Sequence, residues 1–277
     1  MCKKIEGAIV IHGPGRSGTT LFNNILALHP ELSWISGYVN RFPDYPVLTI
    51  LNRLQEISAF ERATRGRRYF PRTAEAYDYW DHYLEYVRNY DERQIENIDF
   101  EKVIRSLRAV MRYQGKRRLV IKLTGLARGK MLRQIFNDPT ILYLDRDPRD
   151  VIVSYFGQRW LHKNDPMFEK MDRRILWKEY GDLFAKIQAT KEELRAFRFK
   201  QLRYEDLVDD PIGFFEEVND WCRLSHDARF YQLVRSWDIR KSSVARWKAF
   251  LKPEEVDLVN SLLLPFLQGL GYEVGKE

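Results

Sequence analysis

A glycine-rich turn near the start of the chain carries the residues best suited to bind an anion. The stretch GPGRSGTT, residues 13–20, follows a short apolar run from Ala8 to Ile11 and precedes a predicted amphipathic helix ending near His29-Pro30. A strand, a glycine loop and a helix together present backbone N–H groups and the positive end of a helix dipole to an anion. The spacing Gly13-x4-Gly18 is that of a phosphate-binding P-loop.

One residue separates this loop from that of the nucleoside triphosphatases. Those enzymes carry a lysine directly after the second glycine, where this chain has Thr19. The fixed cation is instead Arg16, inside the loop. A P-loop kinase or triphosphatase also needs a carboxylate that holds magnesium, and we can nominate none from the sequence. That class is therefore an alternative that the loop disfavours.

A second anion site is predicted in the stretch DRDPRDVIVSY, residues 145–155. Arg146 stands at the carboxyl end of a predicted strand, the edge where open α/β sheets bind ligands. Pro148 suits the first turn of a helix, with Asp147 as its N-cap, and Ser154 lies two turns further on. Arg146 and Ser154 thus converge near a helix start, where they favour a phosphate. A helix cap with surface ion pairs is the alternative interpretation.

The elements that position these residues read as an α/β fold. Short apolar strands alternate with helical patterns, which indicates a parallel sheet covered by helices in three layers. The predicted strands are Ala8–His12, Leu119–Leu123, Thr140–Leu144 and Phe197–Leu202. The predicted helices after the first are a stripe of Tyr77, Trp80, Leu84 and Val87, then Phe100–Tyr113, Phe168–Arg195 with a break near Gly181, and Pro253–Leu267.

We expect one domain over residues 1–277, with a helical cap at about residues 40–117. The cap region differs in composition, since a basic stretch, RGRRYFPR, precedes an aromatic helix. Its aromatic side chains either pack in the core or also line an acceptor pocket. Its arginines either form a solvated surface or favour an acidic glycan. There is no helix-turn-helix or RNA-binding signature, so a nucleic-acid partner is not expected.

Composition limits the remaining classes. The net charge of +7 and the isoelectric point of about 9.2 favour anionic ligands. The two cysteines, Cys2 and Cys222, have no disulfide or zinc spacing and suit a reducing compartment. We read no signal peptide and no run of about 18 apolar residues, so the expected location is cytoplasmic without a membrane span.

Four ordered motifs resemble those of sulfotransferases that use 3′-phosphoadenosine 5′-phosphosulfate (PAPS). GPGRSGTT resembles the family's 5′-phosphosulfate loop, and RDPRDVIVSY resembles its 3′-phosphate motif. LRYEDL, residues 202–207, and RKSSVARWK, residues 240–248, are similar to two later family segments. The resemblance runs from residue 7 to 272, with a gap at about 40–117.

The resemblance implies transfer of a sulfuryl group from PAPS to a hydroxyl or amine, without a metal. It also implies roles for particular residues. Lys122 would stabilise charge on the leaving phosphate, and Tyr204 would contact the adenosine side, although a packed tyrosine is the alternative. The 5′-phosphosulfate site would comprise Gly15, Arg16, Ser17, Gly18, Thr19 and Thr20, and the 3′-phosphate site Arg146, Ser154, Arg240, Lys241 and Ser242.

The general base is less well marked. Some relatives have a histidine soon after the lysine, but this chain reads Lys122-Leu123-Thr124-Gly125 there. Asp44 is the best-placed carboxylate by spacing, with a loop cap as the alternative, whereas Glu31 stands too near the first helix. His82 and His162 are further candidates. The acceptor stays open among a small molecule, a glycan, a lipid and a peptide, and a non-catalytic nucleotide binder is the remaining alternative.

Overall fold

The centre of the molecule is a sheet of five parallel strands. The computed structural model describes residues 3–67, 69–84, 98–158, 161 and 168–274. The strand order is β3-β4-β2-β6-β7, and a separate parallel pair joins β1 to β5. The bounds are β1 Ile5–Glu6, β2 Ile9–His12, β3 Leu32–Ser33, β4 Arg118–Lys122, β5 Phe136–Asn137, β6 Thr140–Asp145 and β7 Arg198–Arg203. The four predicted strands are confirmed, and the three that sequence reasoning missed are two residues long.

Side chains of the central strand β2 point alternately to the two faces of the sheet, and each face has its own apolar core layer. Val10 of β2 faces a cluster that α4, α5 and α6 complete. Its neighbours Ile9 and Ile11 face the opposite cluster, built with α1, α9, α10 and α11. Successive strand residues point to opposite faces, so a strand covered on both sides is apolar throughout. The helices are α1 Thr19–Leu26, α4 Tyr77–Leu84, α5 Phe100–Gln114, α6 Gly129–Ile135, α9 Tyr204–Asp209, α10 Pro211–Cys222 and α11 Ala228–Arg235.

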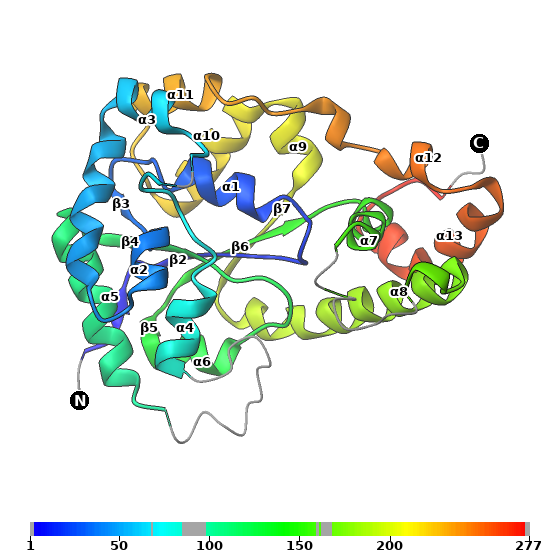
Figure 1. Ribbon diagram of the computed structural model, residues 1–277, viewed down its shortest axis with the longest axis horizontal. Coiled ribbons are helices and arrows are strands. Elements are labelled where there is room, and N and C mark those ends of the chain that lie inside the picture. The colour runs from blue at the N-terminus through cyan, green and yellow to red at the C-terminus, as the bar shows by residue number, and fades with distance from the viewer. Residues whose placement is uncertain (1–2, 68, 85–97, 159–160, 162–167, 275–277) are drawn as a thin grey trace.

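A third apolar cluster lies beyond the carboxyl end of the sheet, at the right of Figure 1. It joins α7 Pro148–Phe156, α8 Arg173–Thr190, α12 Arg246–Phe250 and α13 Pro253–Gly269. The predicted break at Gly181 is wrong, because α8 continues through it. One glycine costs a helix only about 1 kcal/mol. Burial of Trp177 and Phe184 on either side outweighs that cost.

The segment between β3 and β4 supplies the helices along one edge of the sheet. It contains α2 Gly37–Arg41, the 3-10 helix η1 Pro46–Glu56, α3 Ser58–Thr64, α4 and α5. Figure 1 shows these elements together at the left of the molecule. The aromatic stripe packs in the core, since Trp80 and Leu84 are buried, while Val87 lies outside the described residues. None of the helices in the described residues is long and apolar enough to cross a membrane.

Candidate active site

The glycine loop after β2 is pressed tightly against its surroundings. Gly13 and Gly18 both have positive φ, of 157° and 91°. A Cβ on Gly13 would lie 2.5 Å from the Leu144 carbonyl oxygen, and one on Gly18 would lie 2.2 Å from the Tyr204 ring. These contacts explain why the loop has glycine at both positions, and they place Tyr204 directly against the loop.

Within the loop, the remaining predicted donor residues stand close together. The Ser17 hydroxyl donates to the Pro14 carbonyl oxygen at 2.8 Å, and Gly15 lies beside Tyr155. Thr19 is buried at the first position of α1. The first N–H groups of this helix have no partner inside the helix, so its start is electropositive.

The two predicted phosphate motifs meet in space. Arg16 Nε donates to Ser154 Oγ at 3.0 Å, and Arg146 Nη1 donates to the Arg16 carbonyl oxygen at 3.0 Å. The Asp147 carboxylate caps α7 by accepting from the Arg149 N–H, as predicted. Arg146 Nε is buried and has no hydrogen-bond partner among the described residues. Residues far apart in sequence thus form one cationic, donor-rich edge.

The basic segment at residues 240–248 reaches the same edge through Ser243, which was not among the residues predicted from sequence. Ser243 accepts from Arg146 through its carbonyl oxygen, and its hydroxyl lies 2.7 Å from the Tyr204 hydroxyl. Arg240 instead pairs with Asp238 at 2.9 Å on the surface. The Lys241 side chain is exposed, and that of Ser242 lies outside the described residues.

Lys122 ends β4 with its side chain buried beside the loop. Its ammonium donates to Thr20 Oγ1 at 2.8 Å and forms an ion pair with Glu75. Burial lowers the pKa of Lys122, the Glu75 carboxylate opposes that shift, and the Arg16 guanidinium adds to it. The Lys122 side chain thus lies buried where the glycine loop meets the helical segment.

Glu75 is the functional candidate that sequence reasoning missed. The chain before it is fixed by a bridge between Ser36 and Thr73 and by a hydrogen bond from the Gly37 N–H to the Arg72 carbonyl oxygen at 3.0 Å. Thr73 also bonds to Asn24 of α1. These contacts hold the segment over α1, and the Thr20 hydroxyl then donates to Glu75 at 3.3 Å. No local sequence signal marks this carboxylate, because tertiary contacts position it.

The carboxylates and histidines considered from sequence lie elsewhere. Asp44 pairs with His82 Nε2 at 2.9 Å on the surface and is not brought to Lys122. Glu31 accepts from the Ser225 N–H at 2.7 Å. His162 lies outside the described residues.

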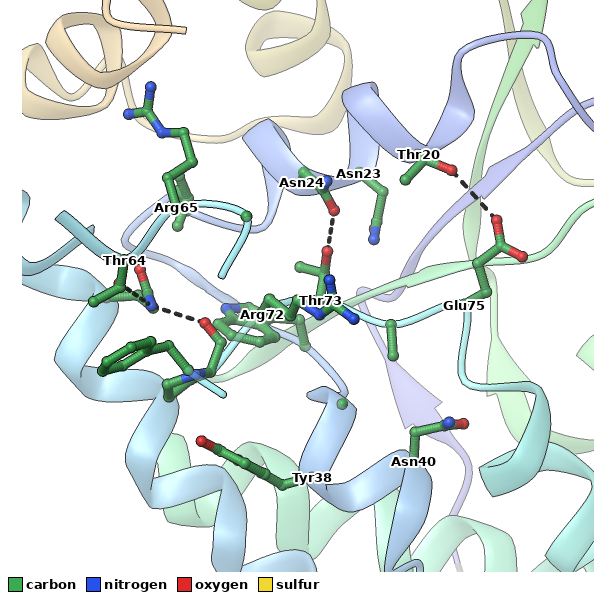
Figure 2. Close-up of a pocket in the computed structure, with 18 of the residues that line it drawn as sticks. Thr20, Asn23, Asn24, Tyr38, Asn40, Thr64, Arg65, Arg72, Thr73 and Glu75 are labelled. Carbon is green, nitrogen blue, oxygen red and sulfur yellow. Dashed lines mark hydrogen bonds between the residues drawn. The ribbon is translucent and has the colours of Figure 1, made fainter. Parts of the chain in front are cut away.

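A cavity of about 850 Å³ opens beside Lys122 and Glu75. Figure 2 shows Thr20 and Glu75 at one end and Thr64 and Arg65 at the other. Amide and hydroxyl side chains share the lining with aromatic rings and arginines. The lining includes Asn23, Asn24, Trp34, Tyr38, Asn40, Arg41, Phe42, Tyr69, Phe70, Arg72, Thr73 and Trp237. Such a lining suits a ligand with both polar and apolar surface.

The fold and the site define an α/β protein with a lysine-free P-loop that contacts the second predicted phosphate motif. A family model described as the sulfotransferase family matches residues 8–228. The chain therefore belongs to the sulfotransferase family.

Curated and solved relatives agree with this family. The omega-hydroxy-beta-dihydromenaquinone-9 sulfotransferase Stf3 of Mycobacterium bovis is 33% identical over 92 residues, which cover 30% of this chain and 23% of that protein. The match thus spans less than a quarter of that relative. Sulfotransferase STF9 from Mycobacterium avium has a TM-score of 0.60 at 15% identity, covering 98% of this chain and 78% of that chain. The sulfotransferase domain from the curacin biosynthetic pathway has a TM-score of 0.56 at 18% identity, covering 99% and 100%. These structures share the fold.

Proposed function

We propose that the protein transfers a sulfuryl group from PAPS to a hydroxyl of an acceptor bound in the 850 Å³ cavity. The observation that carries this proposal is the contact between Arg16 and Ser154, which joins the two phosphate motifs directly beside the buried Lys122. Family membership supports the reaction class. The named relative supports a hydroxyl as the acceptor group, since its name specifies an omega-hydroxy compound.

The residues present fit a nucleotide with phosphates at two positions. The glycine loop leads into the first turn of α1, whose free backbone N–H groups suit a phosphosulfate. Ser154, Arg16 and Arg146 offer donors for a 3′-phosphate, and the Nε of Arg146 has no hydrogen-bond partner within the described part of the chain. PAPS supplies the activated sulfuryl group when bound.

Lys122 and Glu75 are the pair that we assign to the chemistry. The acceptor oxygen forms a bond to sulfur while the bond from sulfur to the 5′-phosphate oxygen breaks, leaving 3′-phosphoadenosine 5′-phosphate (PAP). Glu75 takes the acceptor's proton, and Lys122 stabilises the negative charge on the departing phosphate. Glu75 rather than Asp44 has this role in our proposal, because Glu75 lines the cavity and contacts Lys122.

We further propose that the reaction needs no metal. A sulfuryl group carries less negative charge than a terminal phosphoryl group, so fixed cations suffice to position it. Thr19 in place of the P-loop lysine and the separate cation Lys122 support this difference from the triphosphatases.

Calorimetric titration with PAP in the presence of EDTA tests the donor assignment. We expect micromolar binding of PAP and much weaker binding of AMP, which lacks the second phosphate. Turnover of PAPS with candidate hydroxyl acceptors then separates an enzyme from a non-catalytic binder. Absence of PAP binding, or ATP binding that requires magnesium, would reject PAPS as the sulfuryl donor.

A further inference from the structure

The 3-10 helix η1 is amphipathic in the opposite sense to an ordinary surface helix. Thr49, Asn52 and Gln55 recur every three residues and form its buried face. Asn52 donates to the Trp34 carbonyl oxygen at 3.0 Å, and Gln55 donates to the Pro71 carbonyl oxygen at 2.8 Å. The polar face is therefore fixed inward by hydrogen bonds, and the apolar side chains are left on the outside.

Most of these outward side chains are large and apolar. Seven of the eleven exposed large apolar side chains of the described residues fall between residues 42 and 57, each 38–61% exposed. Figure 1 shows η1, in light blue, on the outer side of the molecule beside α5. We define the apolar face as Phe42, Tyr45, Val47, Ile50, Leu51, Leu54 and Ile57. A concentration of this kind marks an interaction surface.

Positive charge accompanies the apolar face. Residues 41–72 contain seven arginines and three acidic residues, a net charge of +4. Two of those acids have partners outside this segment, Asp44 with His82 and Glu56 with Lys116. Helix α5, against which η1 packs, adds exposed basic side chains at Lys102, Arg105 and Arg112. A partner with both apolar and anionic groups would complement this surface.

The apolar face also reaches the rim of the acceptor cavity. Phe42 belongs to the face and lines the cavity, and its exposed neighbour Arg41 lines the cavity too. Tyr69, which is 83% exposed, lines the same rim. A surface that docks on this face thus lies next to the cavity entrance.

We propose that the apolar face docks the protein on the surface of an anionic lipid bilayer. Exposed apolar side chains flanked by arginines are suited to enter the headgroup region while the arginines contact anionic lipids. A second copy fits less well, because a two-fold contact would set the same arginine-rich surface against itself. Docking also brings the cavity to the bilayer, so that a lipid-borne hydroxyl reaches Lys122 and Glu75; this last step rests on the proposed function.

Cosedimentation with vesicles tests the docking surface without PAPS or acceptor. The vesicles are phosphatidylcholine alone or phosphatidylcholine mixed with phosphatidylglycerol. We expect binding to the mixed vesicles, weakened about tenfold or more by Ile50→Ser with Leu54→Ser, because both side chains lose their apolar contact with the lipid. Arg53→Gln is expected to weaken binding about fivefold, and added salt to weaken it further.

The chain offers a matched control. Ile175 and Leu264 are 50% and 37% exposed, close to Ile50 and Leu54 at 48% and 38%, but belong to α8 and α13. Ile175→Ser with Leu264→Ser should leave vesicle binding unchanged, and PAP titration checks that each variant is folded.

Three outcomes would overturn the proposal. They are absence of vesicle binding by the unaltered protein, equal binding by both double variants, and a dimer abolished by the Ile50 and Leu54 changes without any vesicle binding. PAP binding and PAPS turnover would remain intact in each case, so that docking and the proposed function fail separately.

Discussion

The carboxyl edge of the sheet and the helical segment between β3 and β4 differ in how their candidate site residues are positioned. At the sheet edge, short motifs at strand ends gather donors for phosphate, and the pairing of β2 with β6 brings those motifs together. In the helical segment, the proposed general base Glu75 is positioned by tertiary contacts such as the Ser36–Thr73 bridge. The proposed PAPS site is thus marked by local sequence motifs, whereas the proposed acceptor site is assembled only on folding.

Replacement of the Glu75 carboxylate by an amide gives the largest expected effect on turnover. Glu75→Gln should lower turnover of PAPS by about 10²–10⁴-fold, the range for loss of a general base, with PAP affinity little changed. Asp44→Asn is the matched control, because Asp44 pairs with His82 outside the cavity lining. Steady-state kinetics on both variants decides between the two carboxylates, and activity retained by Glu75→Gln would reject our assignment.

Removal of the contact between the two phosphate motifs should weaken nucleotide binding. Arg16→Ala and Ser154→Ala are each expected to cost about 1.5–3 kcal/mol of PAP binding free energy, since each removes a charge-assisted hydrogen bond. Arg41→Ala, in the acceptor half of the molecule, should leave PAP affinity unchanged. Calorimetry on the three variants measures the difference, and equal affinity in all of them would contradict the two-site assignment.

Glycine substitution contrasts the two regions in stability. At Gly18, with φ at 91°, a Cβ would meet the Tyr204 ring at 2.2 Å, so Gly18→Ala should lower the free energy of unfolding by about 1–3 kcal/mol. At Gly37 of α2 an added Cβ would meet nothing within 4 Å, and Gly37→Ala should be neutral or slightly stabilising. Denaturant unfolding of both variants measures this difference in stability. Equal stability would mean that the glycine loop shifts to accommodate the added methyl group at little cost.

The sequence predicts the fold well where burial is continuous. The strands β2, β4 and β6 follow from apolar runs, and Pro148 and Pro253 both occupy the first turns of helices as expected. The two-residue strand β3 carries no periodic signal, because its position depends on pairing with β4. The break expected at Gly181 is wrong because local propensity omits the packing of Trp177 and Phe184.

The site divides in the same way. Arg16, Arg146 and Ser154 can be found from sequence because strand ends and helix starts fix their positions. Ser243 rather than Arg240 reaches Arg146, because the path of the loop and not the residue type decides which residue lies there. Glu75 is beyond such prediction, since its neighbours in sequence show nothing of the contacts that hold it over α1.

The pH dependence of turnover tests the contact between the two regions, the ion pair of Lys122 with Glu75. Burial lowers the pKa of Lys122 from its ordinary 10.5. The proposed mechanism uses the protonated ammonium of this residue. Turnover should therefore fall as pH rises through a value below 10.5, because the leaving phosphate loses its cation.

Two variants test whether Lys122 causes this fall in turnover at high pH, the alkaline limb of the pH profile. Glu75→Gln removes the carboxylate that favours the charged ammonium, so the limb of its residual activity should move to lower pH. Lys122→Arg keeps its charge throughout, and the limb should disappear from whatever activity this variant retains. Asp44→Asn is the control and should leave the limb in place. A limb that persists unchanged in Lys122→Arg would belong to another group, and the buried lysine would then serve the fold of the glycine loop rather than the leaving phosphate.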